Sequence, residues 1–157
     1  MARARKVELD CGAPFVVAAV QVVEVRSQEV FEQAERVLDL GDVERVHDMR
    51  VATRRLRAAL EVFAPAFPRK RHRRALKRVK ALADALGARR DLDVEIGLLE
   101  SLAPAVATDD ETALAELLDG LHAAQLRANE ELAPFVAGKR LKKLRKRLRK
   151  LAGSAAA

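Results

Sequence analysis

The sequence predicts an all-α protein, an antiparallel helical bundle with four main helices and shorter ones beside them. Half of the 157 residues are apolar, Ala and Leu dominate this set, and five Phe are the only aromatic residues. This composition favours packing of helices on helices over a sheet sandwich. Five Pro and a few Gly and Asp residues divide the chain at roughly regular intervals, as short turns between helices would.

One domain is expected, because a chain of 157 residues suits a single compact core and leaves little room for a second. No stretch of the sequence is long enough to be a linker between domains. We place the domain at residues 14–151, with an N-terminal extension at 1–13 and a frayed tail at 152–157.

Six helices are expected, at about residues 14–40, 42–64, 69–86, 91–103, 108–134 and 139–151. Pro14 favours the first turn of the first helix, and Asp42 can cap the second. Gly87 is expected to end the third helix in the left-handed conformation, and Asp91 to cap the short fourth one. Asp109 lies at the start of the fifth helix, where a negative charge interacts favourably with the helix dipole.

Basic and acidic residues occur in alternating blocks. Residues 69–90 carry ten basic side chains and one acidic one, and residues 138–157 carry nine basic side chains and none that is acidic. Between them, residues 91–137 carry one basic and eleven acidic side chains. We expect some of these charges to pair within the fold. The basic blocks nevertheless exceed what solubility requires, so the sequence predicts an anionic partner.

The second expected helix concentrates its cationic side chains on one face. At 100° per residue, Arg50, Arg54 and Arg57 fall within a sector of about 80°, together with His47. The apolar side chains of this helix fall on the opposite face, so the helix has a core side and a cationic side. Guanidinium groups spaced in this way can bind successive phosphates of an extended polyanion through charge-assisted, often bidentate hydrogen bonds.

The third and last expected helices repeat this pattern. Arg73, Lys77 and Lys80 lie on one side of the third helix, beside an apolar arc. The last helix carries a stripe of leucines and nine Lys and Arg residues, among which Lys143 and Lys146 are candidate anion-binding residues. The alternative is that these cations form solvated faces or pair with the acidic block at 91–137, and for these two helices it stays open.

Three segments resemble the conserved-histidine α-helical domain (CHAD) family. They are Val46-His-Asp-Met-Arg-Val-Ala-Thr-Arg-Arg-Leu-Arg57, Leu82-Ala-Asp-Ala-Leu-Gly87 and Arg90-Asp-Leu-Asp-Val94. The resemblance covers about residues 14–151. It implies an all-helical fold whose basic inner surface binds inorganic polyphosphate without catalysis, with phosphate or sulfate ions as stand-ins. It also implies association with polyphosphate granules.

Site residues carry over position by position. His47, Arg50, Arg54, Arg55 and Arg57 match the signature helix, although Arg55 falls outside the main sector and can reach a neighbouring helix instead. Lys77, Lys80 and Arg90 lie in the following basic segment. Members of the family usually carry two tandem halves, and this chain matches one. The resemblance therefore implies half of a two-bundle fold, and we expect a homodimer that restores the missing basic wall.

Nucleic-acid binding is the main alternative, since charge alone does not distinguish RNA or DNA from polyphosphate. Binders of single strands stack bases on aromatic side chains, and the five Phe residues here are scattered at positions better explained as core. The acidic start of the second helix, Asp42-Val-Glu44, would repel a DNA backbone. A third alternative is docking of a partner or a membrane surface on the leucine stripe.

Metal binding and catalysis have little support in the sequence. His47, His72 and His122 lie on three different expected helices, without a partner at a recognised ligand spacing. Phosphate-binding loops and nucleophile motifs are absent from the sequence, so we expect no enzyme, no cofactor and no metal. The single Cys11 excludes an internal disulfide. With no signal peptide or apolar span, we expect a cytoplasmic protein and no membrane partner.

Overall fold

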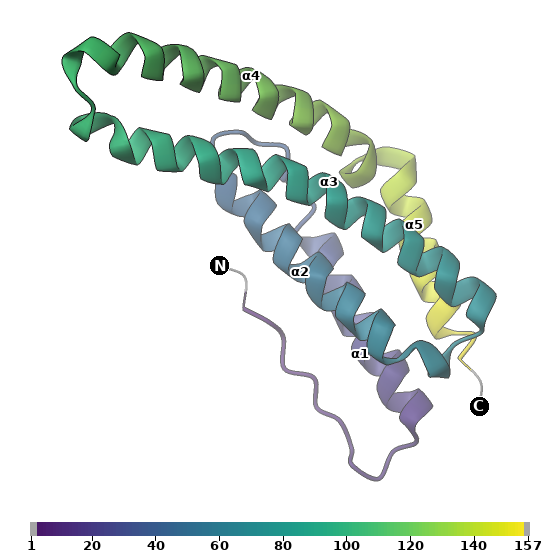
Figure 1. Ribbon diagram of the computed structural model, residues 1–157. Helices are drawn as coiled ribbons and strands as arrows, with labels where there is room; N and C mark the ends of the chain where they lie inside the picture. Colours follow the sequence, from purple (N-terminus) through teal and green to yellow (C-terminus); the bar gives the residue numbers. More distant parts are fainter. Residues whose placement is uncertain (1–2, 156–157) are drawn as a thin grey trace.

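The structure is a computed structural model that describes residues 3–155, and in this part of the chain its regular secondary structure consists of helices alone (Figure 1). Its helices are α1 (Phe15–Glu32), α2 (Val43–Val62), α3 (Arg69–Leu102), α4 (Glu111–Val136) and α5 (Gly138–Ala152). Short 3-10 turns, η1 (Ala64–Ala66), η2 (Ala103–Ala105) and η3 (Thr108–Asp110), lie in the connections after α2 and α3. The predicted all-α helical bundle is confirmed.

The helices form a bundle from which one antiparallel pair projects (Figure 1). α1, α2, α5, the first half of α3 and the end of α4 pack around a core of almost completely buried side chains, among them Leu60, Leu86 and Leu132. The second half of α3 and the first half of α4 extend beyond the other helices as a two-helix arm. We define the arm as residues 91–102 and 111–126.

α1 ends at Glu32, before the predicted end at Leu40. The backbone of Arg36 adopts a left-handed φ of 58°, which a helix interior does not allow, and its guanidinium lies 2.7 Å from the Asp39 carboxylate. These turns bury the side chain of Val37 in the core. The predicted first helix is therefore too long. Apolar side chains continue beyond Glu32, but Val37 reaches the core from a turn and not from a helix.

α3 is one continuous helix of 34 residues, so the predicted break at Gly87 and the predicted cap at Asp91 are both wrong. A glycine inside a helix costs about 1 kcal/mol relative to alanine. Burial of Leu86 and Ile96 on either side of Gly87 offsets this cost, because both side chains need the helix to continue. The chain turns only beyond Leu102, where Pro104 comes in the following turn.

The ends of α4 and α5 differ from expectation by a few residues. α4 begins at Glu111, after η3, and continues past Pro134 to Val136. α5 begins at Gly138, whose φ of 63° is left-handed. The tail at 152–157 was expected to fray, but its described residues are ordered against the bundle. Ala152 belongs to α5, and Ala155 packs against the core. Residues 156 and 157 of that tail lie outside the described residues.

The N-terminal extension folds back along α1. The backbone N–H of Arg5 donates to the buried carboxylate of Glu29 at 2.6 Å, and the Arg5 guanidinium lies 2.7 Å from Glu32. Arg26 donates to the same Glu29 oxygen at 2.7 Å. The described part of the extension is thus held against the bundle, and residues 1 and 2 lie outside the described range.

Buried polar side chains join the two helices of the arm at its base. Arg89 of α3 is fully buried and pairs with Asp93 one turn further along, and Gln125 of α4 donates to the same Asp93 oxygen at 2.7 Å. Asn129 donates from α4 to the backbone carbonyl of Leu38 at 3.0 Å. These contacts hold α4 against both α3 and the connection between α1 and α2.

Candidate functional site

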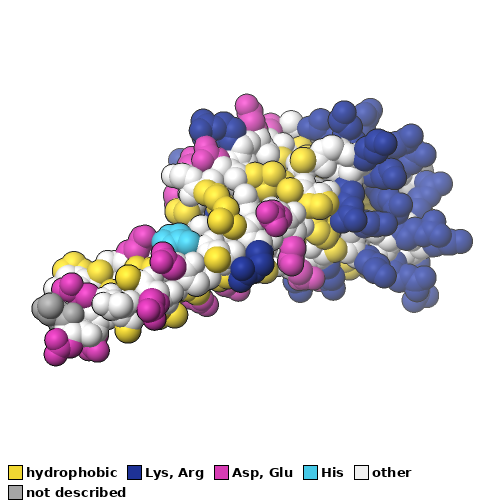
Figure 2. Space-filling view, turned by 90° about the horizontal axis from the view of Figure 1, so that it is seen from above, with side chains coloured by type: hydrophobic (Ala, Val, Ile, Leu, Met, Phe, Trp, Pro, Cys, Tyr) yellow, Lys and Arg dark blue, Asp and Glu magenta, His cyan; other side chains and the backbone are white. Residues whose placement is uncertain are grey.

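Charge is separated along the long axis of the molecule. Lys and Arg side chains gather at the end of the bundle, and Asp and Glu side chains gather on the arm (Figure 2). We expected some cations of the basic blocks to pair within the fold, and some to pair with the acidic block at 91–137. Among the described residues one pair joins a basic block to the acidic block, Arg89 with Asp93, and Lys80 and Arg90 pair with Glu61 and Glu44 instead. Pairing between the blocks is therefore limited to the base of the arm, and the cationic end is left to solvent.

A groove between α2 and α3 contains the cationic face predicted for the second helix. We call it the α2 groove, and it is lined by Arg50, Val51, Arg54, Arg57, Ala83, Asp84, Gly87, Ala88 and Asp91. The α3 wall consists mainly of small side chains, which leave room between the helices. Three arginines of α2 therefore reach one open channel, as their helical spacing predicts.

Glu61 partly neutralises this groove. Its carboxylate lies 3.2 Å from both the Arg57 guanidinium and the Lys80 ammonium. The hydrogen bond from Arg57, followed by that from Lys80, holds the pKa of Glu61 below its ordinary value. Arg57 and Lys80 thus lie beside the same groove, but each already has an anionic neighbour.

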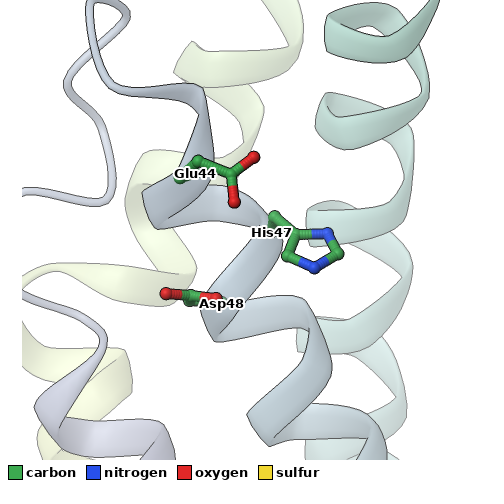
Figure 3. Close-up of side chains that lie close together, drawn as sticks. All are labelled: Glu44, His47 and Asp48. Atoms are coloured by element: carbon green, nitrogen blue, oxygen red, sulfur yellow. The ribbon is translucent and has the colours of Figure 1, made fainter. Parts of the chain in front are cut away.

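His47 lies one helical turn before Arg50, and its imidazole extends toward α3 (Figure 3). Ligand atoms of Glu44, His47 and Asp48 lie within 4.8 Å of one another, so these three could in principle hold a metal ion. All three come from about one turn of α2. The Arg90 guanidinium lies 3.7 Å from Glu44 and would repel a cation. His47 at the end of the arginine row is better placed to donate to an anion.

The remaining predicted residues of α2 and α3 lie at the edges of this region. Arg90 is largely buried, and its guanidinium is 3.5 Å from the backbone carbonyl of Val43. Arg73 and Lys77 are exposed on α3, on the same side as Lys80. Arg55 lies on the opposite side of α2, in a pocket shared with Glu29 and Glu32 of α1.

A second basic groove lies between α3 and α5. We call it the α5 groove; it comprises two adjoining pockets that share Lys143 and Arg147. Its lining is Arg71, Arg74, Arg78, Leu82, Phe135, Arg140, Lys143, Leu144, Lys146, Arg147 and Lys150. Lys143 and Lys146 were predicted as site residues.

Sequence reasoning missed the α3 wall of this groove. The cationic sector chosen for that helix contained Arg73, and Arg71 and Arg74 point elsewhere. The signal was present, because Arg71, Arg74 and Arg78 also follow a helical spacing of three and four residues. Their importance depends on α5 packing beside them, and about 70 residues separate the two segments in the sequence.

The leucine stripe of α5 is part of the core. Leu144, Leu148 and Leu151 are buried against the bundle. They are therefore not exposed for docking a partner or a membrane surface. No helix within residues 3–155 combines the length and apolar character that crossing a bilayer requires.

Fold and site together define a class: an all-helical bundle whose cationic side chains line grooves at one end. The chain belongs to the CHAD domain family, because residues 22–157 match the sequence profile of the CHAD domain. The CHAD domain is associated in general with the binding of polyphosphate and triphosphate. Searches of curated proteins and of solved structures gave no significant match.

Proposed function

We propose that this protein binds inorganic polyphosphate without catalysing a reaction on it, and that the α2 groove is a site of binding. The observation that carries the proposal is the row of Arg50, Arg54 and Arg57 along one open groove. Successive members of this row are separated by about 6 Å and 4.5 Å along the helix axis. An extended polyanion lying in the groove can therefore accept charge-assisted hydrogen bonds from all three guanidinium groups.

Nucleic acid fits the groove less well than polyphosphate does. The lining of the α2 groove contains no aromatic side chain on which a base could stack. Each of the five Phe residues contacts another side chain: Phe15 packs on Phe63, Phe67 stacks on His72, and Phe31 and Phe135 lie under Arg145 and Arg140. None of the five rings lines the α2 groove, which favours a partner there that consists of phosphate alone.

The test is a double substitution, Arg50→Ala with Arg54→Ala. Hydrogen bonds to charged groups contribute roughly 1.5–3 kcal/mol each, so we expect a loss of affinity for long-chain polyphosphate of about a hundredfold or more. Neither side chain is part of the core, so the melting temperature should change little. Arg45→Ala with Arg127→Ala removes the same charge outside both grooves and is the matched control.

Two outcomes would count against the proposal. Affinity unchanged by the double substitution would show that the arginine row is a solvated face. Equal displacement of bound polyphosphate by RNA or duplex DNA, at fixed salt concentration, would show generic polyanion binding instead.

We also propose that the protein acts as a homodimer. Val94, Leu98 and Leu102 are about half exposed and lie on the face of α3 that continues from Gly87 and Asp91 of the α2 groove. A second chain packed on this apolar face would lie beside the open groove and would bury these three side chains. Light scattering should give twice the monomer mass, and Leu98→Glu should give a monomer. A wild-type monomer that binds polyphosphate tightly would contradict the proposal.

Association with polyphosphate granules follows from the same proposal. A protein that binds successive phosphates of polyphosphate is expected to localise where polyphosphate accumulates. A fluorescent fusion should overlap with a polyphosphate stain, and the overlap should be lost with Arg50→Ala and Arg54→Ala. Retention of the overlap in that variant would indicate recruitment by another surface.

A further inference from the structure

The two basic grooves open on nearly opposite faces of α3. The α3 residues of the α2 groove, from Ala83 to Asp91, centre on one side of the helical wheel. Arg71, Arg74 and Arg78 of the α5 groove centre about 150° away at 100° per residue. α3 therefore forms a wall between the grooves, and one short anion does not contact both.

The α5 groove has more uncompensated charge than the α2 groove. Eight of its lining residues are Lys or Arg and none is acidic. Within the described residues, no carboxylate lies within ion-pair distance of any of these eight cations. The α2 groove, by contrast, contains Asp84 and Asp91, and Glu61 pairs with its Arg57. Repulsion among like charges in the α5 groove is relieved only by an anion from solution.

Both walls of the α5 groove are held in place by packing. Leu144, Leu148 and Leu151 anchor α5 in the core, and Ala75 and Val79 anchor the facing part of α3. The Arg140 guanidinium lies 5.2 Å from the centre of the Phe135 ring, a cation–π contact at the start of α5. A groove between two anchored helices presents its cations without a large cost of ordering the backbone.

We infer that the α5 groove is a second, independent site for the same polyanion, so that one chain holds two polyphosphate strands and links them together. This inference rests on the proposed function, since it takes the α2 groove as the first site. Its consequence is bridging: a protein with two sites on opposite faces crosslinks long polyphosphate into large assemblies.

The experiment separates the two sites by charge reversal. Arg71→Glu with Arg74→Glu changes the α3 wall. Both positions are near the start of α3, where acidic side chains do not destabilise a helix. Lys143→Glu with Arg147→Glu acts on the α5 wall of the same groove. Since the two pairs lie on different helices, a folding defect in one of them would not be shared by the other. Arg50→Glu with Arg54→Glu tests the α2 groove.

Titration calorimetry with tripolyphosphate gives the number of sites per chain. We expect two sites for the wild type and one for each charge-reversal variant. With long-chain polyphosphate, the wild type should scatter light most at an intermediate ratio of protein to phosphate. Each variant should lose at least nine-tenths of this scattering while still binding tripolyphosphate.

The results that would overturn the inference differ from those that would overturn the proposed function. The wild type could show one site, and both α5-groove variants could keep full binding and scattering. This result would exclude the second site and would not affect the proposed site in the α2 groove. A dimer with α2 grooves alone would also keep its scattering in those variants. Binding lost only in the α5-groove variants would instead show a single site there and reject both statements.

Discussion

Glu61 competes with phosphate for Arg57 of the α2 groove and for Lys80 beside it, because its carboxylate is 3.2 Å from both side chains. Glu61→Gln removes the negative charge and leaves an amide of similar shape. We therefore predict that this variant binds polyphosphate severalfold more tightly at neutral pH, measured by titration at fixed salt concentration. Glu24→Gln, on α1, is the control for net charge. Equal gains in both variants would show a long-range charge effect without competition at the groove.

The same side chain predicts a pH dependence. Arg57, and then Lys80, hold the pKa of folded Glu61 below its ordinary value of 4.5. A carboxyl whose pKa is lowered on folding contributes stability above its unfolded pKa, and that contribution is lost as the pH falls through the folded pKa. The difference in affinity between wild type and Glu61→Gln should therefore persist at pH 7 and shrink only as the pH falls through the lowered pKa of the folded Glu61 carboxyl. A difference independent of pH would contradict this account.

Arg89 is a buried charge, and its contribution to stability depends on its partners. Burial, followed by repulsion from Arg90, lowers the pKa of its guanidinium, and two of its nitrogen atoms lack hydrogen-bond partners. Arg89→Met leaves the buried Asp93 carboxylate without its cation, so we predict a loss of about 3–5 kcal/mol in the free energy of unfolding. Replacing Arg89, Asp93 and Gln125 together by Met, Leu and Leu should recover most of that loss.

Denaturant unfolding of the two variants measures this difference. If the triple variant is as unstable as Arg89→Met, the cluster has a packing role that apolar side chains of similar volume do not replace.

At the level of single residues, the sequence predicted one groove better than the other. Arg50, Arg54 and Arg57 lie on one helix, and local geometry alone places them together. The residues of the α5 groove come from helices that are distant in the sequence, so only Lys143 and Lys146 were predicted. The proximity of Glu44 to His47 and Asp48 was also missed, although helical spacing of three and four residues contains it.

At the level of elements, apolar periodicity predicted which segments are helical, and turn residues predicted their ends less well. Gly87 and Asp91 both resemble helix-end signals, but burial of Leu86 and Ile96 outweighs them. Arg36, by contrast, adopts a left-handed conformation without being a glycine. Tertiary packing decides both cases, and it cannot be read from a local signal.

The continuity of α3 predicts the effect of removing one of its glycines. Gly97 is exposed in the arm, and a Cβ added there would meet no atom within 4 Å. Gly97→Ala should therefore raise the free energy of unfolding by about 0.5–1 kcal/mol through helix propensity. Thermal unfolding measures the gain, and polyphosphate affinity should be unchanged because Gly97 lies outside both grooves. A loss of stability would indicate that another chain covers this part of α3.

At the level of the whole molecule, the sequence showed the charge blocks but not how they separate in space. Partial neutralisation within the fold was the expectation for blocks of similar size. α3 limits it, because its 34 residues extend about 50 Å and carry basic side chains at one end and acidic ones at the other. The fold thus holds the two kinds of charge apart (Figure 2).

This separation predicts how the acidic arm affects binding. Glu100 is about 14 Å along α3 from Asp91, at the end of the α2 groove. That distance exceeds the Debye length of about 8 Å at 0.15 M salt but not the 30 Å or so at 0.01 M. For a single chain, neutralising the arm with Glu100→Gln, Glu111→Gln and Glu116→Gln should therefore change polyphosphate affinity less than twofold at 0.15 M salt. At 0.01 M salt it should accelerate association.

Stopped-flow kinetics at the two salt concentrations measures this effect, and Glu8→Gln, Glu24→Gln and Glu35→Gln form the control with the same change in net charge. The homodimer makes a different prediction, because a second chain on the outer face of α3 brings its own arm close to the α2 groove. In that arrangement the carboxylates of the partner's arm lie within screening distance, and neutralising them strengthens binding at 0.15 M salt as well. A large effect at 0.15 M would therefore support the dimer and contradict a monomer whose arm and grooves act independently.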